Sequence, residues 1–114
     1  MSEVNIPTNE EMEALVIEQL KTIYDPEMPV NIYDLGLIYN VNCETNEATK
    51  LKMCHITMTL TSATCSMSEV IVDLVRSIHF RIEFLEKVDV ALVFDPPWSQ
   101  KNMSDEAKLE MGLL

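Results

Sequence analysis

The stretch from Leu51 to Phe94 most constrains the fold, because a helical pattern lies there between two strand-like patterns. Every second residue is apolar in about 51–60 and again in about 88–94, as in strands with one buried face. The intervening apolar residues have helical spacing: Met67, Val70, Ile71, Leu74, Val75 and Ile78. A strand, a helix and a strand in succession predict two parallel strands joined by a crossover.

The residues before this unit predict a helix and a third strand. Thr8 and Glu11 form a capping-box pattern, and the apolar stripe that follows predicts a helix over about 9–23. Alternation over 37–43 predicts a strand, and the polar run 44–50 is then a hairpin connection.

The C-terminal part predicts one more helix. The motif Asp95-Pro96-Pro97-Trp98 ends the last strand, and Ser104 is suited to cap a short helix that Gly112 closes. The order α-β-β-α-β-α predicts an α+β fold, a two-layer sandwich whose small mixed sheet carries the helices on one face. We expect a flexible tail over 1–8 and a single domain over 9–114.

Composition excludes several functions. The formal charge of -11 opposes nucleic acid and anionic membranes as partners, since both attract basic proteins. No apolar run is long enough for a membrane span, and the start of the chain lacks a signal-peptide pattern, so we expect a cytoplasmic protein. Gly36 and Gly112 are the only glycines, so a phosphate-binding glycine loop is impossible and no nucleotide cofactor is expected.

The three cysteines are Cys43, Cys54 and Cys65, without a C-x-x-C pair. This pattern argues against a disulfide framework and against a self-contained zinc site. Cys43 and Cys54 fall on the apolar faces of their strands, as small buried hydrophobic residues do. Cys65 falls just before the predicted start of a helix, where free N–H groups and the helix dipole favour a thiolate that can bind metal or attack.

Other candidate residues have two readings. The hydroxyls of Thr59, Thr61 and Ser62 could support a ligand on the sulfur of Cys65, or could simply cap the loop. The acidic residues around the proline turn could likewise have a functional role or could simply cap backbone groups, as Asp commonly does in turns: Asp25, Glu27 and Asp34. Trp98 is more often a packing plug than an anchor for a partner.

Three motifs then form one pattern: the run 25–39, the strand end 58–62 followed by Cys65, and the run 95–98. Together they closely resemble the SufT and PaaD-like family of metal–sulfur cluster assembly proteins. The resemblance extends over nearly the whole chain. It departs at Ala63 and Ser66, where the family often has proline. The chain also lacks the cysteine-rich C-terminal region usual in the PaaD branch, so the stand-alone SufT-like branch fits better.

The resemblance implies an auxiliary role in maturing iron–sulfur proteins, as an assembly factor and not a metabolic enzyme. The family's reactive cysteine corresponds to Cys65, and its acidic turn to Asp25, Glu27 and Asp34. The implied partners are the assembly machinery and client apoproteins, and the implied cargo is a transient iron ion or cluster bound at Cys65.

Two rival hypotheses remain. In one, the protein is a metal-free adaptor that recruits clients through Pro96, Pro97, Trp98 and its acidic surface. In the other, Cys65 is the nucleophile of an enzyme, but neither histidine is placed beside it as a base. A sheet face without helices would carry Met53, Ala91 and Val93, which suggests a homodimer.

Overall fold

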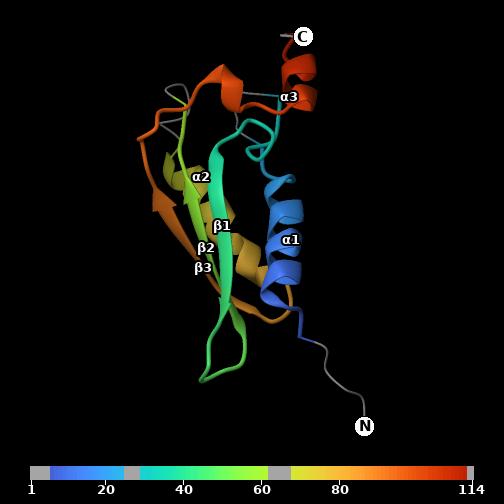
Figure 1. The fold of residues 1–114 in the computed structure, drawn as a ribbon, viewed down its shortest axis with the longest axis vertical. Coiled ribbons are helices and arrows are strands. Elements are labelled where there is room, and N and C mark those ends of the chain that lie inside the picture. The colour runs from blue at the N-terminus through green and yellow to red at the C-terminus, as the bar shows by residue number, and fades with distance from the viewer. Residues whose placement is uncertain (1–5, 25–28, 62–67, 113–114) are drawn as a thin grey trace.

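The computed structural model describes residues 6–24, 29–61 and 68–112. Within these ranges, three helices and three strands follow one another in the predicted order (Figure 1). They are α1 (Asn9–Leu20), β1 (Ile38–Thr45), β2 (Lys52–Met58), α2 (Ser68–Arg76), β3 (Leu85–Leu92) and α3 (Asp105–Glu110), with short 3₁₀ turns at Ser77–Phe80 and Gln100–Asn102. β1 pairs antiparallel with β2, and β2 pairs parallel with β3, which confirms the mixed sheet.

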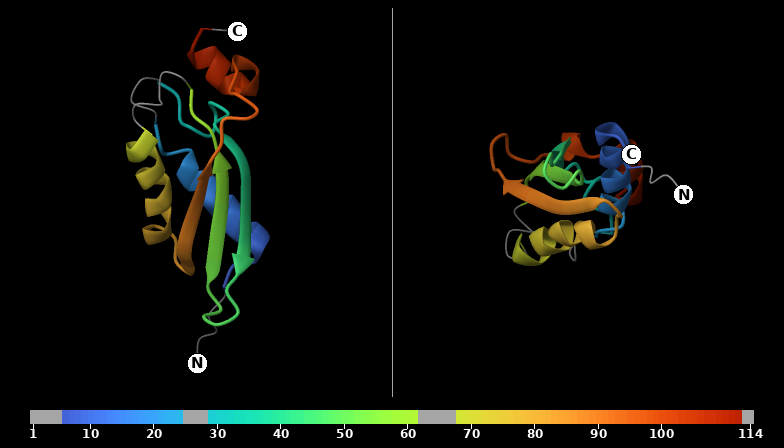
Figure 2. Two further views of the ribbon diagram at one scale, coloured as in Figure 1. Left: turned by 90° about the vertical axis from the view of Figure 1, so that its left-hand side faces the viewer. Right: turned by 90° about the horizontal axis from the view of Figure 1, so that it is seen from below.

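The helices α1 and α2 pack on the same side of the sheet, and none of the helices that the structure describes covers its other face (Figure 2). The core between the layers includes Met12 and Val16 of α1, Ile56 of β2, and Ile71 and Val75 of α2, all exposed by 1% or less. This arrangement confirms the α+β two-layer architecture. The predicted apolar stripes are buried only in part: Leu15, Val70 and Leu74 are 43%, 47% and 37% exposed.

Helix α1 begins where its cap predicts and ends earlier than expected. Thr8 accepts a 3.1 Å hydrogen bond from the Glu11 N–H, and the Glu11 carboxylate accepts a 2.9 Å bond from the Thr8 N–H. The helix ends at Leu20 and not at Ile23, because the Ile23 N–H bonds to the Leu20 carbonyl at 3.2 Å in a tighter final turn. In the described part of the chain, no helix has the length and apolar character needed to cross a bilayer.

The last strand starts three residues before the predicted Val88 and ends two residues before Phe94. Its pairing with β2 shifts register between Lys52 and Met53, so the buried residues Leu85 and Val88 are three positions apart. The alternation of apolar residues along a strand has a period of two, so it could not reveal that the strand starts at Leu85. Phe94, expected on the buried face, is 57% exposed.

The C-terminal helix agrees with its predicted caps. The Ser104 hydroxyl accepts a 3.1 Å hydrogen bond from the Ala107 N–H. Gly112 has a positive φ of +74°, as expected for a residue that closes a helix. Ala107 is buried in the core cluster and the Ser104 N–H bonds to the carbonyl of Asp34, so this short helix is anchored to the segment before β1.

Candidate functional site

Three sequence-distant motifs meet where β2 ends. The Thr59 N–H donates a 2.8 Å hydrogen bond to the carbonyl of Leu37, which joins the strand end to the segment before β1. The Trp98 indole N–H donates a 2.6 Å bond to the carbonyl of Leu35, which joins the loop after β3 to the same segment. The structure therefore assembles this end of the molecule from all three motifs (Figure 1).

Asp34 is held in this assembly by its own hydrogen bonds. Its N–H donates to the Asn31 side-chain oxygen at 2.8 Å, and its carboxylate accepts from the Asn31 amide at 2.8 Å. Its carbonyl accepts a 2.8 Å bond from the Ser104 N–H, the residue that caps α3. These contacts agree with the capping reading of Asp34.

An irregularity in the pairing of β1 with β2 accompanies a contact between Tyr39 and the loop after β3. The register with β2 shifts between Ile38 and Asn40, and the intervening Tyr39 has no partner in the ladder. Such a bulge re-aims a side chain. Here the Tyr39 hydroxyl donates a 2.8 Å hydrogen bond to the carbonyl of Pro96, whose preceding peptide bond is cis.

The Thr59 hydroxyl is buried just after β2. Thr59 is 1% exposed, and its Oγ1 has no hydrogen-bond partner among the residues that the structure describes. Its neighbour Thr61 is 6% exposed. An unsatisfied buried hydroxyl costs free energy, so its presence at a strand end calls for an explanation other than stability.

Four predicted site residues lie outside the described residues: Asp25, Glu27, Ser62 and Cys65. The same holds for Ala63 and Ser66, where the chain departs from the family pattern. Cys65 lies in the chain between Thr61, three residues after the end of β2, and Ser68, the first residue of α2. Tyr24 and Asn31, which flank the acidic turn in sequence, pair with each other in an isolated bridge.

The loop after β3 has an exposed part and an anchored part. Phe94, Pro96 and Pro97 are exposed, and the half-buried Trp98 packs against the core. A cleft of about 380 Å³ lies beside the two prolines. It is lined by Gly36, Ile38, Tyr39, Pro96, Pro97 and Asn102.

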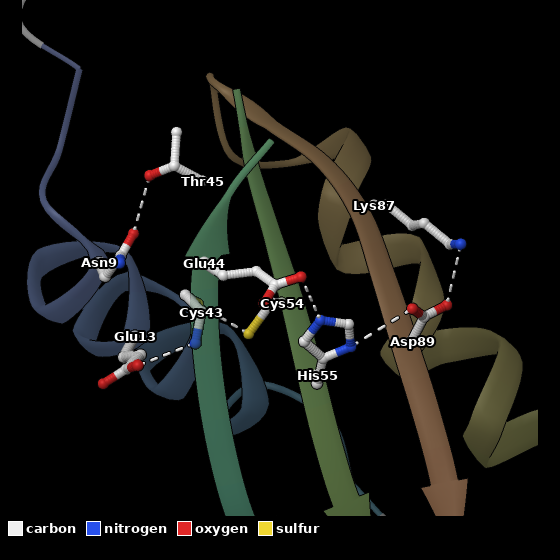
Figure 3. Close-up of polar contacts among 9 residues, drawn as sticks. All are labelled: Asn9, Glu13, Cys43, Glu44, Thr45, Cys54, His55, Lys87 and Asp89. Atoms are coloured by element: carbon white, nitrogen blue, oxygen red, sulfur yellow. Dashed lines mark hydrogen bonds and ion pairs between the residues drawn. The ribbon is translucent and has the colours of Figure 1, made fainter. Parts of the chain in front are cut away.

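The sequence did not show that Cys43 and Cys54 touch each other. Both are buried as predicted, and their Sγ atoms are 2.9 Å apart across β1 and β2 (Figure 3). The hydrogen bond between the two thiols lowers the pKa of Cys43 from its ordinary value, whereas the same bond and burial raise the pKa of Cys54. The pairing depends on the register of the hairpin, which could not be predicted from the sequence.

The opposite face of the same strands carries a charged row. The His55 imidazole lies between Glu44 at 3.2 Å and Asp89 at 3.3 Å, and Lys87 reaches Asp89 at 3.4 Å (Figure 3). The two carboxylates approach different ring nitrogens, so they do not face one shared point. Among the residues that the structure describes, no group of three or more acidic, histidine or cysteine side chains could hold a metal ion.

Comparison with known proteins shows the family of this chain. Residues 13–91 match the iron–sulfur cluster assembly protein family. An Fe–S protein maturation auxiliary factor of Porphyromonas gingivalis is 40% identical over 99 residues, which cover 87% of this chain and 90% of that protein. The auxiliary factor SufT of Staphylococcus aureus is 35% identical over 91 residues, which cover 80% of this chain and 98% of SufT.

A solved structure shares the same fold. The crystal structure of a domain of unknown function from Bacillus anthracis superimposes with a TM-score of 0.78 at 34% identity, over 93% of this chain and 96% of that one. The chain therefore belongs to the iron–sulfur cluster assembly protein family, as the sequence motifs predicted.

Proposed function

We propose that this protein is an auxiliary factor in iron–sulfur protein maturation, which transiently binds iron or a cluster through Cys65 and aids its delivery to apoproteins. The observation that carries this proposal is the meeting of three motifs at the end of β2, just before Cys65 in the chain. Relatives that share most of the chain are named Fe–S protein maturation auxiliary factors, which agrees with a role as a helper and not as a metabolic enzyme.

The chemistry assigned to Cys65 is that of a labile ligand. A thiolate is the form of cysteine that binds iron. One thiolate cannot hold a cluster that normally takes four ligands, so the others come from a client thiol or from Cys65 of a second subunit. Cargo bound by so few ligands leaves readily, as delivery requires.

The polar residues near the strand end would tune that ligand. Within residues 6–24, 29–61 and 68–112 the buried Thr59 hydroxyl has no partner, so it can offer a donor to a sulfur or a cargo atom. In this proposal Asp25, Glu27, Thr61 and Ser62 form the rest of the polar surroundings. Asp34 contributes by holding the segment before β1 in place, through its bonds to Asn31.

Metal and sulfide analysis tests this proposal. We expect iron, acid-labile sulfide and visible absorption in anaerobically purified or reconstituted protein, and their loss in Cys65→Ala. Cys43→Ala is the matched control, because it removes a thiol at the hairpin end and leaves Cys65 in place. If Cys65→Ala keeps the same iron content as Cys43→Ala, Cys65 is not the ligand.

A metal-free adaptor is the second candidate, and the exposed part of the loop after β3 favours it. Phe94 is 57% exposed, and Pro96 and Pro97 line a cleft. In this case Cys65→Ser leaves client binding intact and Pro97→Ser or Phe94→Ser weakens it in pull-downs with assembly proteins. Trp98→Ala is a poor probe, because Trp98 also anchors the loop to Leu35.

We also propose that two copies associate through the helix-free face of the sheet. Ala91 is exposed there, and Met53 and Val93 are partly exposed. Such a dimer would supply the second Cys65 in the cytoplasm, where thiols stay reduced. Sedimentation equilibrium tests this: Ala91→Glu should give a monomer, and a wild-type monomer at high concentration would contradict it.

A further inference from the structure

Cys43 and Cys54 form a pair of thiols that the proposed function does not use. They are direct partners in the antiparallel register of β1 and β2, and their Sγ atoms are 2.9 Å apart. Cys43 is 4% exposed and Cys54 is fully buried. Both lie toward the hairpin end of these strands, away from the strand end that precedes Cys65 (Figures 1 and 3).

The backbone hydrogen bond of Cys43 shows whether Cys43 and Cys54 are a hydrogen-bonded or a non-hydrogen-bonded pair of the antiparallel ladder. β1 is an edge strand, and the Cys43 N–H donates a 2.8 Å hydrogen bond to the Glu13 carboxylate of α1. That N–H therefore points away from β2, so Cys43 and Cys54 form a non-hydrogen-bonded pair. Such pairs bring the Cα atoms to about 4.5 Å and the side chains close together. This Cα separation is within the range that disulfides adopt, so a bond between the two sulfurs needs no movement of the strands.

We propose that Cys43 and Cys54 are a redox-active dithiol, which a hydroperoxide oxidises to an intramolecular disulfide in the folded protein. The Cys43 thiolate attacks one oxygen of hydrogen peroxide, the O–O bond breaks, and one water leaves after protonation. The resulting sulfenic acid is attacked by the Cys54 sulfur, which forms the S–S bond, breaks the S–O bond and releases a second water. The sum is two thiols and one peroxide giving one disulfide and two waters.

The roles of the two sulfurs follow from their surroundings. The Cys54 S–H stabilises the thiolate of Cys43, and the pKa of Cys43 is lowered. The pKa of Cys54 is raised, so Cys54 stays a thiol until the second step. Cys43 is also the slightly exposed member of the pair, so the peroxide meets the more reactive sulfur first.

The experiment uses the full chain with Cys65→Ser, which leaves Cys43 and Cys54 as the only cysteines. The folded protein is treated with hydrogen peroxide at a level that fully oxidises free glutathione, then quenched, unfolded and alkylated. We expect the thiol count to fall from two to zero per chain, with a mass loss of about 2 Da for the two hydrogens. Peptide mapping should find the bridge between Cys43 and Cys54 within one chain.

Two comparisons separate this dithiol from ordinary thiol oxidation. With Cys54→Ser added, the single Cys43 should gain oxygen and form no internal bridge. The oxidised double-cysteine protein should unfold at a higher urea concentration than its reduced form, because the bridge ties the hairpin. The proposal is overturned if both thiols survive the peroxide, if the bridge forms only after unfolding, or if the products are linked dimers.

Discussion

The indole N–H of Trp98 donates a 2.6 Å hydrogen bond to the backbone carbonyl of Leu35, 63 positions earlier in the chain. This contact fastens the loop after β3 to the segment that leads into β1. It agrees with the packing interpretation of Trp98, and it leaves Pro96, Pro97 and Phe94 as the exposed part of the same loop.

Replacing Trp98 should therefore lower stability. Trp98→Phe keeps a ring but leaves the Leu35 carbonyl without its donor, and we expect a loss of about 1–2 kcal/mol in the free energy of unfolding. Trp98→Ala also removes packing and should cost about 3 kcal/mol. Urea unfolding measures both, with the exposed Phe94→Ala as a control that should change stability by less than about 0.5 kcal/mol. Equal effects at the two positions would show that the Leu35 bond contributes nothing.

Gly36 should tolerate no side chain. Its φ is +82°, and a Cβ atom there would collide with the backbone of Asn102. We expect Gly36→Ala to lower the free energy of unfolding by at least about 2 kcal/mol. Gly112→Ala is the matched control, because Gly112 also has a positive φ, of +74°, but open space around it. Its cost should be limited to about 1 kcal/mol. A similar loss in the two variants would argue against the close approach of Asn102.

Thr59→Val should stabilise the protein while impairing its function. Valine has nearly the same shape and removes the buried hydroxyl, which has no partner in the described part of the chain, so we expect a gain of about 1 kcal/mol in the free energy of unfolding. If the hydroxyl serves the cargo, the same variant should retain less iron after reconstitution. Thr59→Ser, which keeps the hydroxyl, should retain iron at the wild-type level. A Thr59→Val protein that is both less stable and fully loaded would refute both expectations.

The alkylation rate of Cys43 should depend on Cys54. The hydrogen bond with Cys54 and the charge of Lys52 lower the pKa of Cys43, whereas burial and Glu13 raise it. A lowered pKa means that the reactive thiolate forms at lower pH. In a Cys65→Ser background, Cys54→Ala should therefore shift the rise of iodoacetamide labelling of Cys43 to higher pH, and Glu13→Gln should shift it to lower pH. Labelling curves that coincide in all three proteins would contradict the assigned causes.

The sequence was sufficient to predict the order of the elements, because each has a local signal. Thr8 and Ser104 mark helix starts through their own side chains, and alternation marks the strands. Boundaries that depend on pairing between strands could not be predicted in the same way. The early start of β3 at Leu85 follows from a register shift against β2, which no period within the strand reveals.

The candidate site was predictable in its composition but not in its contacts. The motifs that meet at the end of β2 were each visible in the sequence. That Trp98 reaches Leu35, or that Tyr39 reaches Pro96, depends on the fold of distant segments. The contact of Cys43 with Cys54 likewise needs the hairpin register.

The hydrogen bond between Trp98 and Leu35 also determines when, during synthesis, the contacts near the end of β2 can form. Residues 95–104, which include Trp98, are synthesised after Cys65. A nascent chain thus carries its candidate thiol before it can fold the supports around the preceding strand end. In the proposed function, loading with iron or a cluster should accordingly follow the synthesis of residues 95–104 rather than that of Cys65 alone.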